Sequence, residues 1–386
     1  MRIRAPALRD PRSASAGRHV TDTIAAPADA YGDAPPASRA PNEGRGRAAG
    51  AAAALVVVLV GVATLAVSIG SVRLPAGDVW AVVGERLGLP VEGPGGSTET
   101  IVWVVRVPRV LLAALVGAGL AVVGAALQAA VRNPIADPYL LGISSGASVG
   151  AVAVIAFGAG AGLGVWALSG AAFVGALTAT GVVVVLATRR AVTPLRIVLT
   201  GTAVAYTASA ISSFLIYRAP RADAVRSVVF WLLGSLSGAS WAKLVPAALA
   251  VVTGTVVLWA HGRHLNALLA GDDTAAALGV DVARLRRRLV VLTSLVTATV
   301  VAVSGAIGFV GLLLPHGARF LVGHDHRRSI PVTALLGATF LVAVDLVART
   351  VASPEEIPVG IITAGLGAPF FLWALNRRTH DGVAAR

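Results

Sequence analysis

The sequence GRHLNALLAGDDTAAALGVDVARLRRR occupies residues 262–288 and separates two groups of apolar segments. It is the only long, charged and helix-prone stretch between such segments, so we expect it to lie in water beside a membrane. Within it, Asp272 and Asp273 precede a run of small residues that ends at Gly279. Acidic residues at a helix start and glycine at its end are ordinary helix signals. The stretch therefore predicts a soluble docking surface on a membrane-embedded body.

The composition indicates a polytopic membrane protein. Of the 386 residues, 56% are hydrophobic and only 13% are charged, and the mean hydropathy is +0.79, which is rare in a soluble chain of this length. The chain has no cysteine, which excludes disulfides and thiolate chemistry. The net charge of +13 comes almost wholly from arginine, and Lys243 is the only lysine. In a membrane protein such a balance reflects topology, so no nucleic-acid partner is expected.

The chain divides into a polar tail and a series of apolar spans. Residues 1–49 are rich in Arg, Pro and Ala without apolar periodicity and are predicted to be a disordered cytoplasmic tail, and residues 50–386 form the membrane domain. Spans of about twenty apolar residues can cross the hydrocarbon core. The predicted spans are residues 51–70, 108–128, 141–160, 164–188, 195–217, 242–260, 289–304, 307–322, 332–347 and 359–375. A short helix at the membrane interface is expected within residues 227–241.

The distribution of arginine predicts the orientation of these spans. An even number of spans, ten, puts both termini on one side of the membrane, which is the cytoplasm if the tail stays there. The loops on that side, with residues 262–288 among them, then carry more arginine than the longer loops on the other side, as the positive-inside rule requires. We therefore expect a multi-pass protein of the inner (cytoplasmic) membrane with both termini cytoplasmic.

Enzyme signatures are absent from the sequence. The phosphate-binding loop G-x-x-x-x-G-K-[ST] needs a lysine after glycine, whereas Lys243 follows Ala242. Neither HExxH nor GxSxG occurs. We predict a chain that is not an enzyme and holds no cofactor or metal, so any ATP and magnesium would be used by a separate subunit. The pairs His261 with His264 and His324 with His326 have too few companions for a metal site and are interpreted as solvated loop histidines.

The segment RVPRVLLAALVGAGLAVVGAALQAAVRNPIADPYLLGISSGASVGA, residues 106–151, is the most distinctive in the chain. Its glycines offer a small-residue face for tight helix packing, and the turn NPIADP ends one helix and delays the next. Ser144 and Ser145 then lie where the third span should begin. A discontinuous helix start near a pore and simple helix capping are both open, and the spacing alone favours capping.

This segment resembles the signature of the FecCD family, the permease subunits of ABC importers for iron-siderophores, haem and vitamin B12. Residues 271–280 (GDDTAAALGV), 304–328, 341–349 and 356–375 also match, in the order of the family. The resemblance implies an all-α membrane protein with the type II importer permease fold and about ten transmembrane helices. It covers most of the chain after residue 50.

Carried over residue by residue, the resemblance implies three sets of site residues. The cytoplasmic coupling helices, at about residues 263–286, would enter a groove of the ATPase. The residues implied for coupling are Leu265, Gly271, Asp272, Asp273, Ala275, Leu278 and Gly279. Those implied for docking of a substrate-binding protein are Arg106, Arg109 and Arg349, although arginines at helix ends also serve as interfacial anchors. The candidates for the translocation path or gate are Gln128, Asn133, Pro134, Ser144, Ser145 and Asp345.

One of the carried-over positions allows a second interpretation. Asp345 lies inside an apolar span, where it either faces a cavity or partner or is a buried carboxylate bonded to a neighbouring helix. His316 and Arg319 are interpreted as structural.

The resemblance also implies partners and cargo. The partners would be a second permease copy or paralogue, two ATP-binding subunits, an extracytoplasmic substrate-binding protein and the surrounding lipid. The path would lie between the two permeases, lined mainly by the second, third, fifth and eighth spans. Ferric siderophores are the first expected cargo, with haem and cobalamin as alternatives. An ion-coupled secondary transporter and a non-transporting scaffold are rival functions.

Overall fold

The computed structural model describes residues 41–188 and 193–383. Within these ranges the chain is helical and contains no strand, so the all-α class is confirmed. The long helices are α1 Pro41–Ser68, α4 Val107–Val131, α5 Ile143–Phe157, α6 Ala167–Thr188, α7 Pro194–Tyr217, α9 Trp241–Ala260, α12 Val282–Ser304, α13 Val310–Val322, α14 His326–Thr350 and α15 Val359–Val383. The shorter elements are α2 Ala76–Arg86, α3 Gly96–Glu99, the π-helix η1 Thr100–Arg106, η2 Pro138–Leu141, η3 Ala161–Trp166, α8 Ala222–Leu232, α10 Gly262–Leu269 and α11 Asp272–Ala277.

Ten apolar helices correspond to the ten predicted spans, but three of them are short. Seven helices in the described ranges are long and apolar enough to cross a membrane. The shorter apolar helices are Ile143–Phe157, Val310–Val322 and Val359–Leu372. They coincide with the third, eighth and tenth predicted spans, so a full crossing by each of these three stays a prediction.

The first helix begins earlier than the sequence pattern indicated. The predicted tail of residues 1–49 lies outside the described ranges up to residue 40, but α1 starts at Pro41, so residues 41–49 are helical and the predicted boundary is too late. Proline suits the first helical turn because it lacks an N–H that would be unpaired there. The alanines that follow favour continuation into the apolar run.

Two short helices differ from expectation at the end of the bundle opposite α11. α2 lies between the first two predicted spans, where the sequence predicts only a loop, and its apolar residues Val79 and Val82 are buried. The expected interfacial helix exists as α8, but it begins at Ala222 and ends at Leu232, before Gly234 with a φ of +77°. A positive φ is readily adopted by glycine and ends the helix there.

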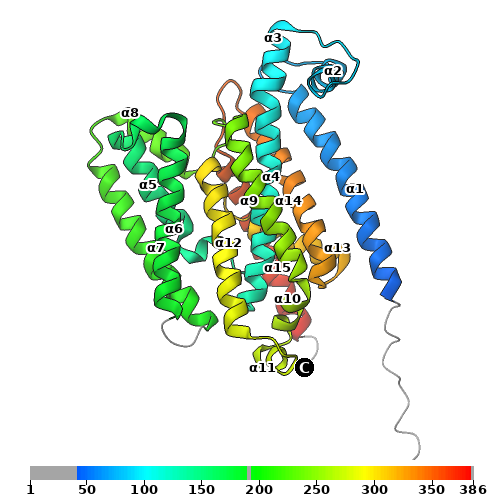
Figure 1. Cartoon of the computed structure of the whole chain (residues 1–386), viewed down its shortest axis with the longest axis vertical. Coiled ribbons are helices and arrows are strands. Elements are labelled where there is room, and N and C mark those ends of the chain that lie inside the picture. The colour runs from blue at the N-terminus through cyan, green and yellow to red at the C-terminus, as the bar shows by residue number, and fades with distance from the viewer. Residues whose placement is uncertain (1–40, 189–192, 384–386) are drawn as a thin grey trace, which may run out of the picture. The chain divides into compact units, whose positions relative to one another are not determined.

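Helix α4 lies at the centre of the bundle, with α14, α13, α12 and α9 packed around it (Figure 1). Glycines permit this close packing. Gly117 faces the backbone of Gly337 on α14, and Gly124 faces the backbone of Gly311 on α13, so closely that a Cβ at either position would overlap those backbone atoms. Dispersion contacts between backbones at such crossings replace the hydrophobic effect, which is weak between helices in lipid.

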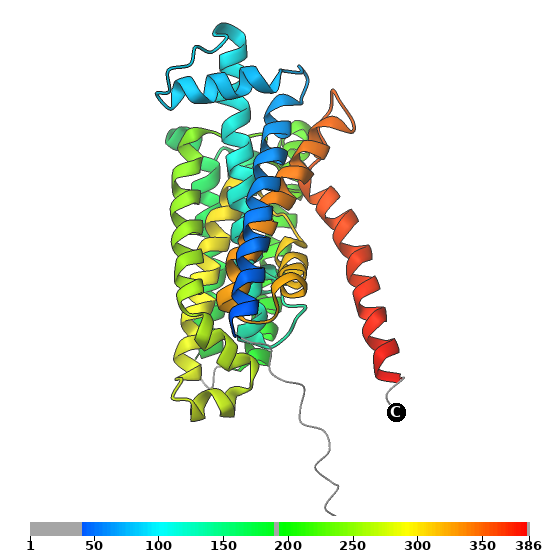
Figure 2. The same ribbon diagram turned by 90° about the vertical axis from the view of Figure 1, so that its right-hand side faces the viewer.

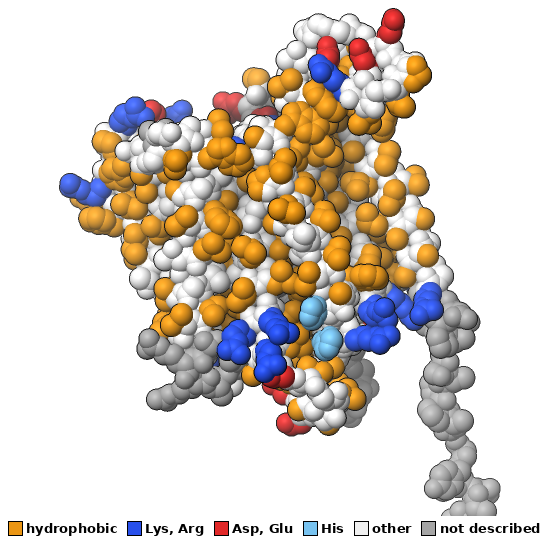
Figure 3. Space-filling model, viewed as in Figure 1, with side chains coloured by type: hydrophobic (Ala, Val, Ile, Leu, Met, Phe, Trp, Pro, Cys, Tyr) orange, Lys and Arg blue, Asp and Glu red, His pale blue; other side chains and the backbone are white. Residues whose placement is uncertain are grey.

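The helices α5, α6, α7 and α8 form a group beside α12, and α1 flanks α13 and α14 (Figures 1 and 2). The start of α1 and the end of α15 lie at the same end of the bundle as α10 and α11 (Figure 2). On the face in Figure 3, charged side chains gather near the two ends of the long helices, and the surface between them is hydrophobic or uncharged. Such a band is what a bilayer requires of the protein surface.

Candidate functional site

The polar stretch forms two short helices, α10 and α11, at one end of the bundle (Figure 1). Gly271, with a φ of +114°, joins them. Leu265, Leu268 and Ala275 are fully buried and pack against α4. By contrast, Leu278 is 69% exposed. The predicted coupling residues therefore divide into buried anchors and an exposed edge, and the exposed edge comprises Asp273, Leu278 and Gly279.

A buried arginine fixes α11 to the bundle. Arg286 on α12 is 2% exposed, and its Nε donates to the carbonyl oxygen of Ala130 on α4 at 2.8 Å. Its Nη2 donates to Asp272 Oδ1 at 3.0 Å. Asp272 also lies 3.7 Å from Arg132 Nε. Asp272 thus connects α11 to α12 and to the end of α4. Arg286 carries no distinguishing signal in the sequence, because it lies in a run of three arginines whose side chains the sequence cannot place.

A second connection joins α10 to α14. Asn266 Nδ2 donates to Asp325 Oδ1 at 2.8 Å, and Asn266 Oδ1 accepts from the backbone N–H of His326 at 3.0 Å. Asp325 also caps α14 by accepting from Arg327 N. Partial burial alone would raise the pKa of Asp325, but the hydrogen bonds from Asn266 and Arg327 outweigh it and lower that pKa. A displacement of α10 would therefore act on the start of α14.

The interpretation of the histidines as solvated is wrong for one of them. His326 is 3% exposed, and its Nδ1 lies 2.7 Å from Asn266 Oδ1. His324 and His264 are exposed, and the rings of His261 and His264 lie 5.6 Å apart. Within the described ranges, no three His, Cys, Asp or Glu residues are grouped closely enough to hold a metal ion.

Gln128 connects α4 to α13. It is 3% exposed, its Nε2 donates to Gly311 O at 3.2 Å, and its Oε1 accepts from Arg319 Nη2 at 2.8 Å. Gln128 and Arg319 line a cavity of about 210 Å³ near α10, together with Asn133 and Pro134. The structure thus places three of the path or gate candidates around one polar cavity beside the coupling helices.

The serines at the start of α5 do not cap it. The N-cap is Gly142, with a φ of +72° and no side-chain cap, so the interpretation of Ser144 and Ser145 as caps is wrong. Instead Ser145 Oγ accepts from Ser209 Oγ on α7 at 3.2 Å. Ser145 therefore links α5 to α7. Gly142 supplies the left-handed turn before α5, so the Ser145 hydroxyl is not needed as a cap.

Irregular backbone precedes both α5 and α13, and these two segments bond to each other. Tyr139 Oη donates to Ile307 O at 3.0 Å and accepts from Ile307 N at 2.8 Å. Unpaired backbone groups are costly in a membrane-embedded bundle, so non-helical segments need such partners. Tyr139 was not among the predicted site residues. The start of α5 is therefore irregular, with Gly142 between η2 and α5, and its position beside a pore stays a prediction.

The predicted docking arginines lie at the opposite end of the bundle and are buried. Arg109 is 8% exposed and Arg106 is 6% exposed. Arg109 Nε donates to Asp345 Oδ1 at 2.9 Å, and its Nη1 donates to Glu356 Oε1 at 2.8 Å. Arg349 Nε lies 3.0 Å from Asp345 Oδ2. Asp345 is thus a buried carboxylate bonded to a neighbouring helix. The positive charges of Arg109 and Arg349 match the negative charges of Asp345 and Glu356.

Arg106 and Arg349 also bond to backbone carbonyls at the end of α1 and in the loop after it. Arg106 Nη1 donates to the carbonyl oxygen of Val67 at 2.6 Å, and Arg349 Nη2 donates to that of Ala66 at 2.8 Å. Buried guanidiniums need such partners because an unpaired charge is costly in a low-dielectric environment. Arg106, Arg109 and Arg349 therefore all bond to groups of this chain. Their role in docking stays a prediction.

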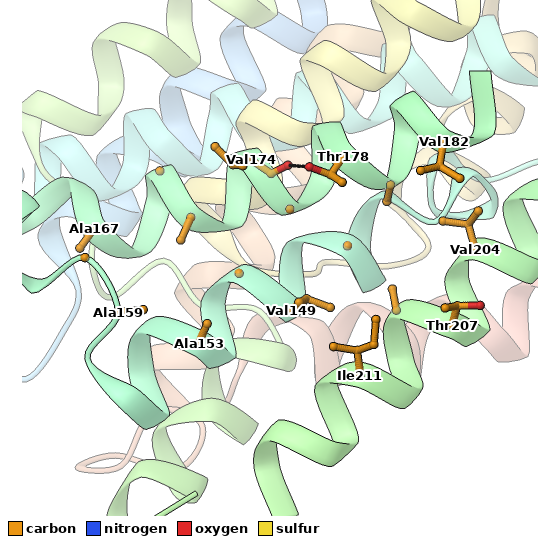
Figure 4. Close-up of a pocket in the computed structure, with 18 of the residues that line it drawn as sticks. Val149, Ala153, Ala159, Ala167, Val174, Thr178, Val182, Val204, Thr207 and Ile211 are labelled. Atoms are coloured by element: carbon orange, nitrogen blue, oxygen red, sulfur yellow. Dashed lines mark hydrogen bonds between the residues drawn. The ribbon is translucent and has the colours of Figure 1, made fainter. Parts of the chain in front are cut away.

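A cavity of about 930 Å³ lies between α5, α6 and α7 (Figure 4). Val149 and Ala153 of α5, Val174 and Val182 of α6 and Ile211 of α7 are among its walls (Figure 4). The Thr178 hydroxyl there is bonded to Val174 O at 2.8 Å. Such walls suit acyl chains or an apolar helix, because a polar cargo would find few hydrogen-bond partners.

The architecture defines a polytopic all-α membrane protein, and comparisons with known proteins give its family. The FecCD transport family matches residues 55–377. The chain is 46% identical over 317 residues to the cobalamin import system permease protein BtuC of Halobacterium salinarum, covering 82% of this chain and 83% of that protein. It is 38% identical to the vitamin B12 import system permease protein BtuC of Vibrio cholerae, over 78% of this chain and 90% of that protein.

A solved structure has the same fold. It is an inward-facing conformation described as a metal-chelate type ABC transporter, with a TM-score of 0.73, 32% identity and coverage of 84% of this chain and 98% of that chain. The chain is also 40% identical to the ABC transporter permease protein YvrB of Bacillus subtilis, over 84% of this chain and 94% of that protein.

This chain belongs to the FecCD family of ABC importer permeases. The all-α polytopic fold with the type II permease architecture is thereby confirmed. Permease subunits of this family are not catalytic, and a separate subunit hydrolyses ATP. The family works with ATPase subunits and a permease partner.

Proposed function

We propose that this chain forms the membrane path of an importer for a large metal chelate, with cobalamin as the first candidate. The observation that carries this proposal is the 46% identity, over 82% of the chain, to a permease named for cobalamin import. The sequence favoured ferric siderophores. They stay the second candidate, because the solved structure with the same fold is described as metal-chelate type. Haem is the third.

The proposed assembly contains a second permease copy or paralogue, two ATPases and an extracytoplasmic binding protein, surrounded by lipid. The exposed edge of α11, with Asp273, Leu278 and Gly279, is proposed to enter a groove of the ATPase. In this orientation α10 and α11 are cytoplasmic, as the arginine distribution favours. The described ends of the chain then lie on the cytoplasmic side as well (Figure 2).

The proposed mechanism transmits ATPase closure through the two polar connections of the coupling helices. A push on α11 acts on α4 and α12 through Asp272 and Arg286. A push on α10 acts on α14 through Asn266. Both connections are short and partly buried, so they favour joint displacement of the helices over local bending. Such displacement would switch the path between inward and outward access.

The rival functions have less support. An ion-coupled transporter needs an ionisable group that can change its charge near mid-membrane, whereas Asp345 is held between two arginines. A non-transporting scaffold would share the exposed edge of α11 but would not need a path.

Reconstitution with a cognate ATPase and binding protein in proteoliposomes tests the proposal. We expect ATP-dependent accumulation of cyanocobalamin and little accumulation of ferric hydroxamates. The reverse preference would make siderophores the cargo. Accumulation without ATP, or none of any chelate with ATP, would contradict an importer.

The exposed edge of α11 can be tested in the same proteoliposomes. Leu278→Asp should uncouple ATP hydrolysis from uptake. Leu87→Asp is a matched control at the far end of the bundle, since Leu87 is 70% exposed and Leu278 is 69% exposed. If both variants import like the wild type, the edge of α11 does not couple.

A further inference from the structure

A second polar pocket lies at the end of the bundle opposite α10 and α11. Its volume is about 530 Å³, and it lies where α8 and the loop after it meet the end of α12 and the starts of α6 and α9. Two cationic side chains, Arg226 and Lys243, line it together with several serines. None of the site residues discussed above lines it.

The pocket carries positive charge that no acidic residue of its described wall neutralises. Among the described residues of its wall there is no Asp or Glu. Asp223, on the same helix as Arg226, is 3.5 Å from Arg221. Within the described ranges the Arg226 side chain makes no hydrogen bond or ion pair, and Arg226 is exposed. Lys243, the only lysine of the chain, donates from Nζ to Gly238 O at 2.7 Å. An ammonium has three donors, so two stay available.

The wall beside these cations is held in place. Ser235 N donates to Ser304 O at 2.8 Å, which attaches the loop to the end of α12, and Gly360 N donates to Leu233 O at 3.0 Å, which attaches it to α15. The hydroxyls of Ser235 and Ser237 lie 2.9 Å apart. Only one of these two hydroxyls donates in that bond, so the other is free to donate into the pocket.

We propose that this pocket binds an oxyanion, either a carboxylate or a phosphate. Arg226 and Lys243 supply the charge, the Ser235–Ser237 pair supplies a hydroxyl donor, and the rings of Phe230 and Trp231 contact the apolar part of the ligand. A guanidinium, an ammonium and a hydroxyl converging on one space are the donors that oxygen anions take in proteins. The oxyanion belongs either to a soluble molecule or to a phospholipid headgroup. The assignment does not depend on which chelate is imported.

Thermal unfolding and calorimetry of the full-length permease test this site. The protein is purified in a neutral detergent without phosphate or carboxylate buffers and titrated with sodium phosphate, with sodium chloride at matched ionic strength as reference. We expect a saturable rise of the melting temperature with phosphate only. Removal of a charge-assisted hydrogen bond in Arg226→Gln or Lys243→Gln should weaken binding about tenfold. Arg218→Gln, which removes an exposed charge nearby that does not line the pocket, should bind as the wild type does.

A variant and a lipid comparison complete the test. Ser237→Asp puts a carboxylate into the pocket and should abolish binding while the protein stays monodisperse. In nanodiscs, a phosphate effect present in phosphatidylcholine and absent in phosphatidylglycerol assigns the site to a lipid headgroup. An equal effect in both lipids assigns it to a soluble anion. An effect that chloride reproduces, or one that persists in the Arg226→Gln/Lys243→Gln variant, would overturn the site.

Discussion

Arg286 of α12 donates to the Asp272 carboxylate of α11 at 3.0 Å and, through Nε, to the Ala130 carbonyl oxygen of α4 at 2.8 Å. One guanidinium therefore joins three helices at the cytoplasmic side proposed here. The planar fork of arginine reaches two acceptors in fixed directions, which a lysine cannot do.

Arg286→Gln should destabilise the permease by about 3 kcal/mol, because it leaves a partly buried carboxylate and a buried carbonyl oxygen without their charged partner. ATP-driven uptake should fall more than the ATPase activity, and Arg286→Lys should restore little. Thermal unfolding and coupled transport measure both effects. The control is Arg284→Gln on the same helix, since Arg284 is 61% exposed, and its effect should stay within about 0.5 kcal/mol. Equal effects of the two changes would contradict the assigned role.

Because of this contact, charge reversal at Asp272 would not report on coupling alone. Reversing Asp272 would put a cation against the buried Arg286, so loss of uptake would combine instability with uncoupling. Gly279 has a φ of +82°, and a bulky residue there would strain the backbone. Leu278 is the cleaner probe of the exposed edge.

Asp345→Asn should destabilise the protein by about 3 to 5 kcal/mol, because two buried arginines would share the single remaining acid, Glu356. Glu356→Gln should cost less, because the Glu356 side chain is 35% exposed and that of Asp345 is 1% exposed. Unfolding of both variants in detergent measures the difference. Uptake by Asp345→Asn should keep the pH dependence of the wild type, and a loss of proton coupling would instead favour a secondary transporter.

Gly124→Ala should separate α4 from α13, because the new Cβ would overlap the backbone of Gly311. Overpacking of this kind costs about 1 to 3 kcal/mol. Gly181→Ala on α6 is a matched control, since a Cβ there meets nothing within 4 Å, and it should be neutral or slightly stabilising. The melting temperature of Gly124→Ala should be lower than that of Gly181→Ala. Equal melting temperatures would show that the α4–α13 crossing can relax.

Asp325 should contribute to the stability of the α10–α14 connection in a pH-dependent way. Its pKa is lowered in the folded state, so the contribution is present above the unfolded value of about 3.9 and is lost as the pH falls through the lower folded value. A double-mutant cycle of Asn266→Ala and Asp325→Asn, measured by unfolding from pH 6 to pH 3, should give a coupling free energy that declines over that window. A coupling that rises toward low pH would have the wrong sign.

The sequence by itself determined the class of protein and the position of the polar stretch between the apolar helices. Apolar runs long enough for a bilayer and the polar stretch at residues 262–288 are local properties, which is why the all-α membrane fold and the helices α10 and α11 could be predicted. The family was identifiable for the same reason, since its motifs are continuous in the chain.

Only the tertiary structure decided which polar side chains are paired. The resemblance implied Arg109 and Arg349 but not their pairing. Asp345 and Glu356, the partners of Arg109, lie far from it in the sequence, and Asp345 lies one helical turn from Arg349. Arg286 and Tyr139 carried no local signal, because their roles depend on acceptors that other helices bring to them. Burial and pairing follow from helix packing, and packing here depends on glycine contacts between segments more than a hundred residues apart, such as Gly124 with Gly311.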